Sequence, residues 1–246
     1  MPSIELLIAL VISVLAHEFA HMAFAWVFGG RVSGFKLSFL GANAWVRGLE
    51  KLKPWKRYIV YLAGPAANAL ITVGAGVAAR FLYGQSELFY NIVLYNTVLC
   101  MFNLLPVFPL DGGRLAQLFL GNRVGVLRAN RVLLKAGPVV GGALMALGLA
   151  QAILYPWNIT LLCAGVYIRR KNKQLPPTLY WECINALQSK DKIHMPTKKI
   201  ILPKHTPAIK AVEYLGWDYF AEIHIEGGRI VSEEELLLHL TAKYLL

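Results

Sequence analysis

Long apolar runs limit what this chain can fold into more than any other feature of its sequence. A membrane-spanning helix needs about 20 predominantly apolar residues, and the sequence predicts about five such spans, one of them broken. They lie near residues 4–28, 58–82, 88–120, 133–155 and 157–169. Only 16% of the residues are charged, against roughly a quarter in a typical soluble domain. The predicted fold is therefore a polytopic α-helical membrane protein.

The third apolar run is too long for one straight span. Pro106 and Pro109 interrupt it midway, shortly before Gly112 and Gly113. Non-helical backbone at membrane depth is tolerated only where protein or a cavity satisfies its polar groups. We therefore expect a broken helix whose turn lies inside the protein.

The acidic residues divide the chain into a membrane body and a water-exposed tail. Residues 1–170 hold five of the 14 acidic residues, and residues 171–246 hold the other nine. This distribution predicts a transmembrane core over residues 1–170, a linker over 171–195 and a small α/β module over 196–246.

The basic residues indicate how the chain is oriented. Lys and Arg gather in the connections 30–57 and 121–135 and again after the last span, and basic connections lie on the cytoplasmic side. The N-terminus is then outside and the module is cytoplasmic, in a multi-pass protein of the cell membrane. The net charge of +11 reflects this orientation in the membrane. The sequence has no basic helix with interleaved aromatic residues, which is the pattern that would indicate a nucleic-acid partner.

Two polar segments also have a predicted structure. Glycines and partial alternation in residues 30–57 predict a short hairpin at the membrane surface. The tail predicts strand, helix, strand, turn, strand and helix, with Thr206-Pro207 opening its first helix. Ser232 and Glu235 form a capping box before its last helix.

The segment HEFAH puts His17, Glu18 and His21 in the middle of the first predicted span. On a helix, the two histidines lie one turn apart on one face, so both imidazoles can bind one ion, and Glu18 can reach a water held there. Ionisable residues inside a span indicate function by default. Zinc suits imidazole ligands. We predict one zinc ion per chain, with Glu18 as the general base.

Two histidines leave one protein ligand to be found. Asp111, in PLDGGR, is the other acidic residue within reach of an apolar span. A turn is the ordinary role of aspartate in a D-G-G sequence. The membrane context and the need for a third ligand instead favour Asp111 as a zinc ligand.

The set HEFAH, AGPAAN and NLLPVFPLDGGR, in this order and on separate spans, resembles the site-2 protease family of intramembrane zinc metalloproteases. The resemblance covers residues 1–170 and implies cleavage of a membrane-associated protein. The family's fuller pattern has a span before its H-E-x-x-H helix, whereas here the motif begins at residue 17. The motif residues of the family fall on His17, Glu18, His21, Leu110, Asp111 and Gly112.

The tail resembles a single cystathionine-β-synthase (CBS) half-module. A protease core followed directly by such a module most resembles the stage IV sporulation protein FB branch of the family. That resemblance implies a pro-sigma factor of the pro-sigma-K type as substrate during sporulation, with regulatory membrane proteins as partners. Paired CBS modules commonly bind adenine nucleotides, so the resemblance also implies ATP sensing and a homo-oligomer formed through the module. Docking of substrate is the alternative role of the module.

Two amide side chains belong to the motifs of the family. Asn68 in AGPAAN and Asn103 in FNLLP are candidates to hold the substrate backbone or to polarise the scissile carbonyl. Hydrogen bonding between helices is the alternative role for both.

Two other functions fit the same residues. One is a general site-2 protease that clears signal-peptide remnants or activates a stress sigma factor. The other is a non-catalytic membrane scaffold or metal-storage protein that uses the same ligands.

Overall fold

The structure is a computed structural model that describes residues 4–38, 41–49, 52–81, 87–155, 158–174, 183–188, 195–204, 206–227 and 229–244. The chain forms two compact units. The first holds residues 1–105 with 110–112, and the second holds residues 106–109 with 113–246.

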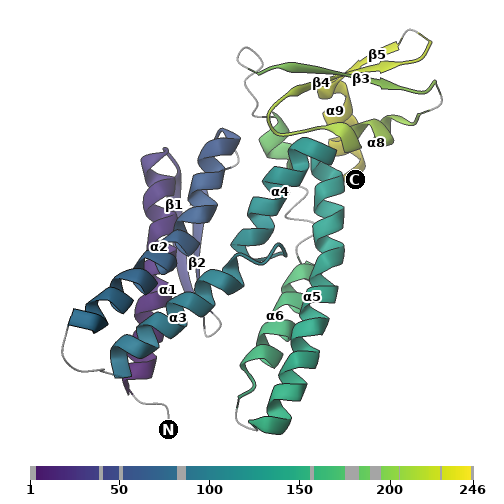
Figure 1. Cartoon of the computed structure of the whole chain (residues 1–246). Coiled ribbons are helices and arrows are strands. Elements are labelled where there is room, and N and C mark those ends of the chain that lie inside the picture. Colours follow the sequence, from purple (N-terminus) through teal and green to yellow (C-terminus); the bar gives the residue numbers. More distant parts are fainter. Residues whose placement is uncertain are drawn as a thin grey trace. The chain divides into compact units, whose positions relative to one another are not determined.

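The first unit, purple to blue in Figure 1, contains three long helices and one hairpin. Its β strands pair antiparallel from Arg31 opposite Arg47 to Ser38 opposite Gly41, which confirms the predicted hairpin. The elements are α1 (Ile4–Val27), β1 (Arg31–Ser38), β2 (Gly41–Arg47), α2 (Pro54–Phe81) and α3 (Glu87–Asn103).

The predicted break in the third apolar run is confirmed. Helix α3 ends at Asn103, residues 104–110 form turns, and α4 (Asp111–Val124) starts at once after them. The turn is closely packed, because a β-carbon on Gly112 would overlap the backbone carbonyl of Leu104. Glycine is therefore required where the new helix begins.

The second unit contains most of α4, two more long helices and the α/β tail (Figure 1). Close approach of the two long helices depends on small residues, since a β-carbon on Gly165 would meet the carbonyl oxygen of Gly141 at 2.5 Å. The two helices are α5 (Val126–Leu154) and α6 (Thr160–Gln174).

The tail has the predicted order of strands and helices. Strand β3 pairs parallel with β4, and β4 pairs antiparallel with β5, in the sheet order β3-β4-β5. The backbone N–H of Glu235 donates to Ser232 Oγ at 3.3 Å, which is one half of the predicted capping box. The elements are β3 (Thr197–Leu202), α8 (Ala208–Ala211), the 3-10 helix η2 (Val212–Tyr214), β4 (Phe220–Ile225), β5 (Arg229–Ser232) and α9 (Glu233–Tyr244).

Within the second unit, the tail packs on the corner between α4 and α5. Trp217 donates its indole N–H to the carbonyl of Gln117 at 3.3 Å. Asn122 accepts hydrogen bonds from the backbone N–H groups of Trp217 and Asp218. The backbone N–H of Val126 donates to the carbonyl of Leu215 at 2.7 Å. The second half of α4 and the first turn of α5 thus hold the segment between η2 and β4.

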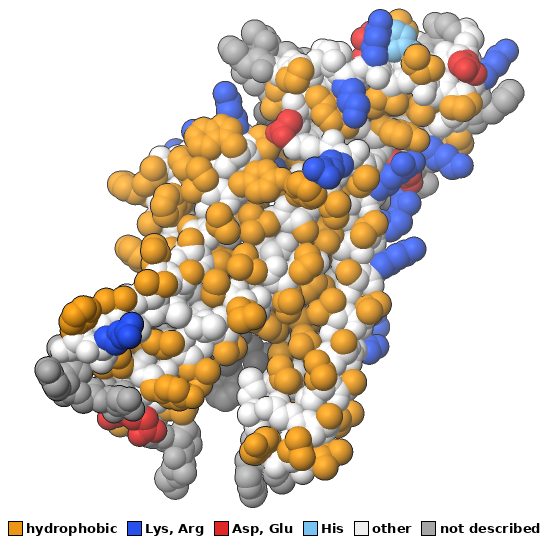
Figure 2. Space-filling view, in the orientation of Figure 1, with side chains coloured by type: hydrophobic (Ala, Val, Ile, Leu, Met, Phe, Trp, Pro, Cys, Tyr) orange, Lys and Arg blue, Asp and Glu red, His pale blue; other side chains and the backbone are white. Residues whose placement is uncertain are grey.

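Three helices of the described residues are long and apolar enough to cross a membrane, namely α1, α2 and α5. Helices α3 and α6 have 17 and 15 residues, so the count of five spans remains a prediction. Large apolar side chains such as Leu70 (74% exposed) and Ile153 (83% exposed) face outward. Figure 2 shows hydrophobic side chains over most of the visible surface of the helices, as expected for surfaces that contact lipid.

The predicted domain boundaries remain predictions. Of the predicted linker, residues 175–182 and 189–194 lie outside the described residues, 171–174 complete α6, and 183–188 are helical.

Candidate metal centre

Helix α1 places His17 and His21 one turn apart, with both rings on its inner side. The side chain of His17 is buried and that of His21 is nearly so, at 6% and 13% exposed. Their Nε2 atoms are 3.1 Å apart, and the ring planes cross at 80°. Both imidazoles therefore present the same atom to one point.

Asp111 reaches the same point as the first residue of α4. Its Oδ2 atom lies 3.1 Å from Nε2 of His17 and 3.1 Å from Nε2 of His21. The turn at residues 104–110 brings this carboxylate back from the end of α3 into the first unit. The three predicted ligands therefore converge.

Hydrogen bonds on the far side of each ring fix which nitrogen faces that point. His17 donates its Nδ1–H to Oδ1 of Asn68 at 2.5 Å, and His21 donates its Nδ1–H to the carbonyl of Val60 at 2.6 Å. Both neutral rings then carry a lone pair on Nε2. Partners of this kind orient histidine ligands in metal sites.

A chain of buried polar groups sets the direction of the Asn68 amide. Its Nδ2 group donates to Oδ1 of Asn96 at 2.8 Å, and Asn96 in turn donates to Ser13 Oγ at 2.7 Å. Asn68, Asn96 and Ser13 are each 0% exposed. Because the amide nitrogen of Asn68 is engaged with Asn96, its oxygen must face His17 and accept the ring proton. Helices α1, α2 and α3 thus share one hydrogen-bond chain that ends at a ligand.

Gly64 provides the space that the two rings occupy. A β-carbon at this position of α2 would lie 2.7 Å from Nε2 of His17 and would overlap Nε2 of His21. The motif AGPAAN therefore contributes twice to the site, through the missing side chain of Gly64 and through the amide of Asn68.

The donor set fits a zinc ion. In the neutral tautomers, three acceptor atoms (two Nε2 and one carboxylate oxygen) face each other with no proton between them, which is unfavourable unless a cation joins them. Two imidazoles and one carboxylate are a known ligand set for catalytic zinc, with a position left for water. His17, His21 and Asp111 could hold such an ion.

The other predicted site residues lie as follows. Glu18 is half-buried on α1, between the two ligands in sequence. Asn68 contacts His17, which gives it a positioning role, so a contact between Asn68 and substrate remains a prediction. Asn103 donates its amide N–H to the carbonyl of Leu99 at 3.0 Å, one turn earlier on α3, and its substrate contact also remains a prediction.

Sequence reasoning missed Asn96, Ser13 and Gly64. A polar amide inside an apolar run, as in LYNTVL, was a sign that could have singled out Asn96. Ser13 and Gly64 gave no such sign, because small residues are common in membrane helices for packing alone.

The fold and the site together define a class of protein: a helical membrane protein whose candidate metal ligands come from H-E-x-x-H on one helix and from an aspartate after a broken helix. The model of peptidase family M50 matches residues 5–87 and 81–147. The chain belongs to this family.

Individual relatives support the assignment. Zinc metalloprotease MJ0392 of Methanocaldococcus jannaschii is 25% identical over 235 residues, covering 92% of this chain and 66% of that protein. Stage IV sporulation protein FB of Bacillus subtilis is 31% identical over 131 residues, covering 52% of this chain and 45% of that protein. The solved structure of the site-2 protease from M. jannaschii matches with a TM-score of 0.58 and 26% identity, over 71% of this chain and 80% of that one. The chain thus spans 66% of the length of MJ0392 and 45% of that of stage IV sporulation protein FB.

Proposed function

We propose that this chain is a zinc endopeptidase that cuts a membrane-associated protein within or near the bilayer. The convergence of His17, His21 and Asp111 at one point, inside a unit with two candidate spans, is the observation that carries this proposal. Membership of peptidase family M50 supports the same reaction. The protein is then a multi-pass protein of the cell membrane, with the α/β module on the cytoplasmic side.

The residues of the chain have distinct tasks in this reaction. When bound, zinc lowers the pKa of water toward neutrality and polarises the scissile carbonyl. Glu18 takes the proton from the attacking water and delivers it to the leaving amine. Asn68 and Val60 keep the two imidazoles in the tautomer that presents Nε2. A contact from Asn103 to the substrate backbone belongs to the same proposal.

The substitution Glu18→Gln tests the mechanism. It preserves size and hydrogen bonding but removes the base, so we expect zinc content to stay at one per chain while cleavage falls at least about 100-fold. Zinc is measured by metal analysis, and cleavage is measured on a co-expressed membrane-tethered substrate. Glu5→Gln, in the first turn of the same helix, is the matched control and should leave both quantities unchanged.

Full cleavage by the Glu18→Gln protein would overturn the mechanism. A cellular phenotype that is identical in the two variants would instead favour the non-catalytic scaffold or metal-storage function.

For the substrate, we propose a pro-sigma factor of the pro-sigma-K type, cleaved during sporulation with regulatory membrane proteins as partners. Its support is the similarity to stage IV sporulation protein FB over 52% of the chain. A general site-2 protease, which clears signal-peptide remnants or activates a stress sigma factor, is the second candidate, because MJ0392 matches over 92% of the chain. Co-expression with a panel of tethered substrates separates them by which one is cut.

Regulation by ATP completes the proposal. The tail has the strand and helix order of a single CBS half-module, and ATP held between two paired modules would require a homo-oligomer. A cleavage rate that does not respond to millimolar ATP would remove this part and leave the protease reaction intact.

A further inference from the structure

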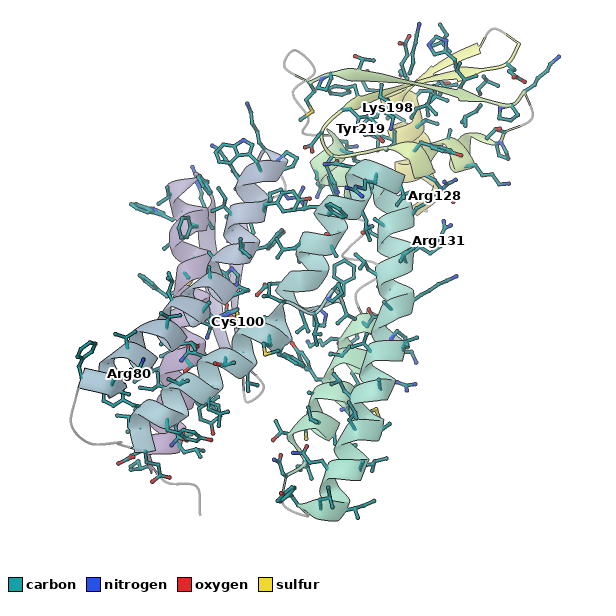
Figure 3. The ribbon with its side chains drawn as sticks, in the orientation of Figure 1. Arg80, Cys100, Arg128, Arg131, Lys198 and Tyr219 are labelled. Carbon is teal, nitrogen blue, oxygen red and sulfur yellow. The ribbon has the colours of Figure 1, made fainter. Side chains whose placement is uncertain are left out.

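A pocket of about 330 Å³ lies in the second unit, where the tail meets the corner of α4 and α5. Residues from the end of α4, the start of α5, η2 and β3 surround it, together with Tyr219 just before β4. Figure 3 shows Lys198 and Tyr219 on the module and Arg128 near the start of α5. The lining residues are Arg123, Val124, Gly125, Arg128, Lys198, Lys199, Ile200, Tyr214 and Tyr219.

Positive charge dominates this pocket. Four of its lining residues are Lys or Arg, and none of the lining residues that the structure describes is acidic. Arg128 is neutralised by Glu213, which it contacts at 2.8 Å and which also binds Arg131 at 2.9 Å. Within the described part of the chain, the other three cations form no ion pair. A concave surface with one sign of charge attracts and concentrates ions of the opposite sign.

The acidic groups near the pocket face other partners. Glu222 lies beside Lys199 in the parallel register of β3 and β4, on the face of the sheet opposite to Lys198. Glu213 bridges two arginines. Surplus positive charge at the pocket therefore has no protein counter-charge among its lining residues.

Aromatic and aliphatic walls complete the pocket. Tyr219 donates its hydroxyl to the backbone carbonyl of Tyr214 at 2.7 Å, which fixes the position of the Tyr219 ring. The ammonium of Lys198 lies 4.9 Å from the ring centroid of Tyr219, so this cation sits over an aromatic face. Ile200 and Val124 add aliphatic surface. A pocket with apolar walls and a few placed charges is typical of small-molecule sites of this volume.

We propose that this pocket binds an organic phosphate, with the phosphate held by Arg123 and Lys198 and its apolar part against the two tyrosines. The ligand bridges β3 of the tail to the corner of α4 and α5, and so adds to the contacts that hold the tail there. One chain forms the whole pocket, which distinguishes it from ATP binding between two paired modules. Two sources supply this chemistry: a nucleotide from solution or the headgroup of an anionic phospholipid.

This inference deepens the regulatory part of the proposed function. Its test measures binding alone and requires no proteolysis. A failed binding test therefore does not contradict the proposed protease reaction. An inactive protease likewise does not contradict the proposed ligand site.

The experiment is thermal unfolding of the full chain in phosphate-free buffer. One arm adds AMP to the protein in a maltoside detergent, and the other compares nanodiscs of phosphatidylcholine with nanodiscs that also contain phosphatidylglycerol. The test variant is Lys198→Ala/Lys199→Ala. The matched control is Lys204→Ala/Lys210→Ala, which removes two exposed charges from the same module outside the pocket. Lys198→Arg/Lys199→Arg keeps the charge and checks that the strand still folds.

A ligand that binds the folded state raises Tm, and near saturation we expect a rise of about 5 °C. The rise should occur in the parent, in the control and in the arginine variant, and should be lost in Lys198→Ala/Lys199→Ala. A response to AMP identifies the soluble source, and a response to phosphatidylglycerol identifies the lipid. The proposal is overturned if neither arm changes the Tm of the parent, or if the alanine variant responds as the control does.

Discussion

At the scale of single residues, the candidate metal centre depends on groups other than the three candidate ligands. Asn68 fixes the ring of His17, and Asn96 fixes the amide of Asn68. Each is fully buried, so a lost partner cannot be replaced by bulk water. A buried polar group left unpaired costs about 1–3 kcal/mol, which makes this hydrogen-bond chain sensitive at every member.

Asn68→Ala should weaken zinc binding without removing a ligand. It deletes the oxygen that accepts the Nδ1 proton of His17, and loss of such a partner typically lowers metal affinity about 10–100-fold. Competition with a chelator measures the affinity. Asn172→Ala is the control, because it removes another buried amide, one that donates to the carbonyl of Leu134 in the second unit. Equal losses of affinity in the two variants would show general destabilisation instead of a role at His17.

Gly64→Ala should abolish zinc binding by displacing the imidazoles. The added β-carbon would lie 2.7 Å from Nε2 of His17, closer than real contacts allow. Gly74→Ala and Gly76→Ala lie in open space on the same helix and should leave zinc content unchanged while stabilising α2 by about 0.5–1 kcal/mol each. Metal analysis of the three purified variants measures their zinc content. A fully loaded Gly64→Ala protein would contradict the packing described above.

At the scale of elements, α4 carries two different functions along its length. Its first residue is the candidate ligand Asp111, and its last turns hold the tail through Gln117 and Asn122. Gly121 faces the indole of Trp217, and a β-carbon there would overlap its Nε1 atom. The side of α4 that faces the tail thus has no room for a larger residue.

Gly121→Ala should weaken the packing of the tail against α4. Overpacking of this kind costs about 1–3 kcal/mol of stability. Each 1.4 kcal/mol changes the equilibrium between the packed and the opened tail roughly tenfold. We expect the amides of β4 to exchange hydrogen about tenfold faster or more, as measured by mass spectrometry. Gly142→Ala is the control, because its β-carbon would meet Arg169 at an ordinary 3.6 Å. Unchanged exchange in β4 of the Gly121→Ala protein would show that Trp217 adapts without loss.

At the scale of the whole molecule, charge contributes to how the tail is held in the second unit. Hydrogen bonds from Arg128 and Arg131 hold the pKa of Glu213 below its ordinary value of 4.5. A carboxylate with a lowered folded pKa stabilises the folded state above its unfolded pKa, and this contribution is lost as pH falls through the folded value. The arginine side chains are 40% and 54% exposed, so solvent limits the gain to about 1 kcal/mol or less.

The docked tail should therefore be more stable at neutral pH than below pH 4.5. Glu213→Gln removes the titrating group and should flatten this dependence, whereas Glu226→Gln, an exposed acid of the same module, should preserve it. Hydrogen exchange of β4 at neutral and acidic pH measures the difference. An identical pH dependence in the parent and in Glu213→Gln would exclude the ion pair as its cause.

The sequence predicted what depends on local pattern. Apolar runs predicted α1 and α2 to within a few residues at their ends, and Pro106 with Pro109 predicted the break before Asp111. The convergence of His17, His21 and Asp111 was predictable because an ionisable residue in an apolar span has few ordinary explanations. The direction of the Asn68 amide was not predictable, because it depends on Asn96 from a third helix. Likewise the contact of Trp217 with α4 joins residues 100 positions apart, and no periodicity encodes such a pair.

The hydrogen bonds on Nδ1 of His17 and His21 have a consequence for how the protein acquires its metal. Because hydrogen bonds to Asn68 and Val60 fix both rings, binding of an ion would immobilise little additional side-chain motion. The rate of loading would depend on the passage of ions from water to a buried point, and the fraction of active protein in a cell would follow its supply of free zinc.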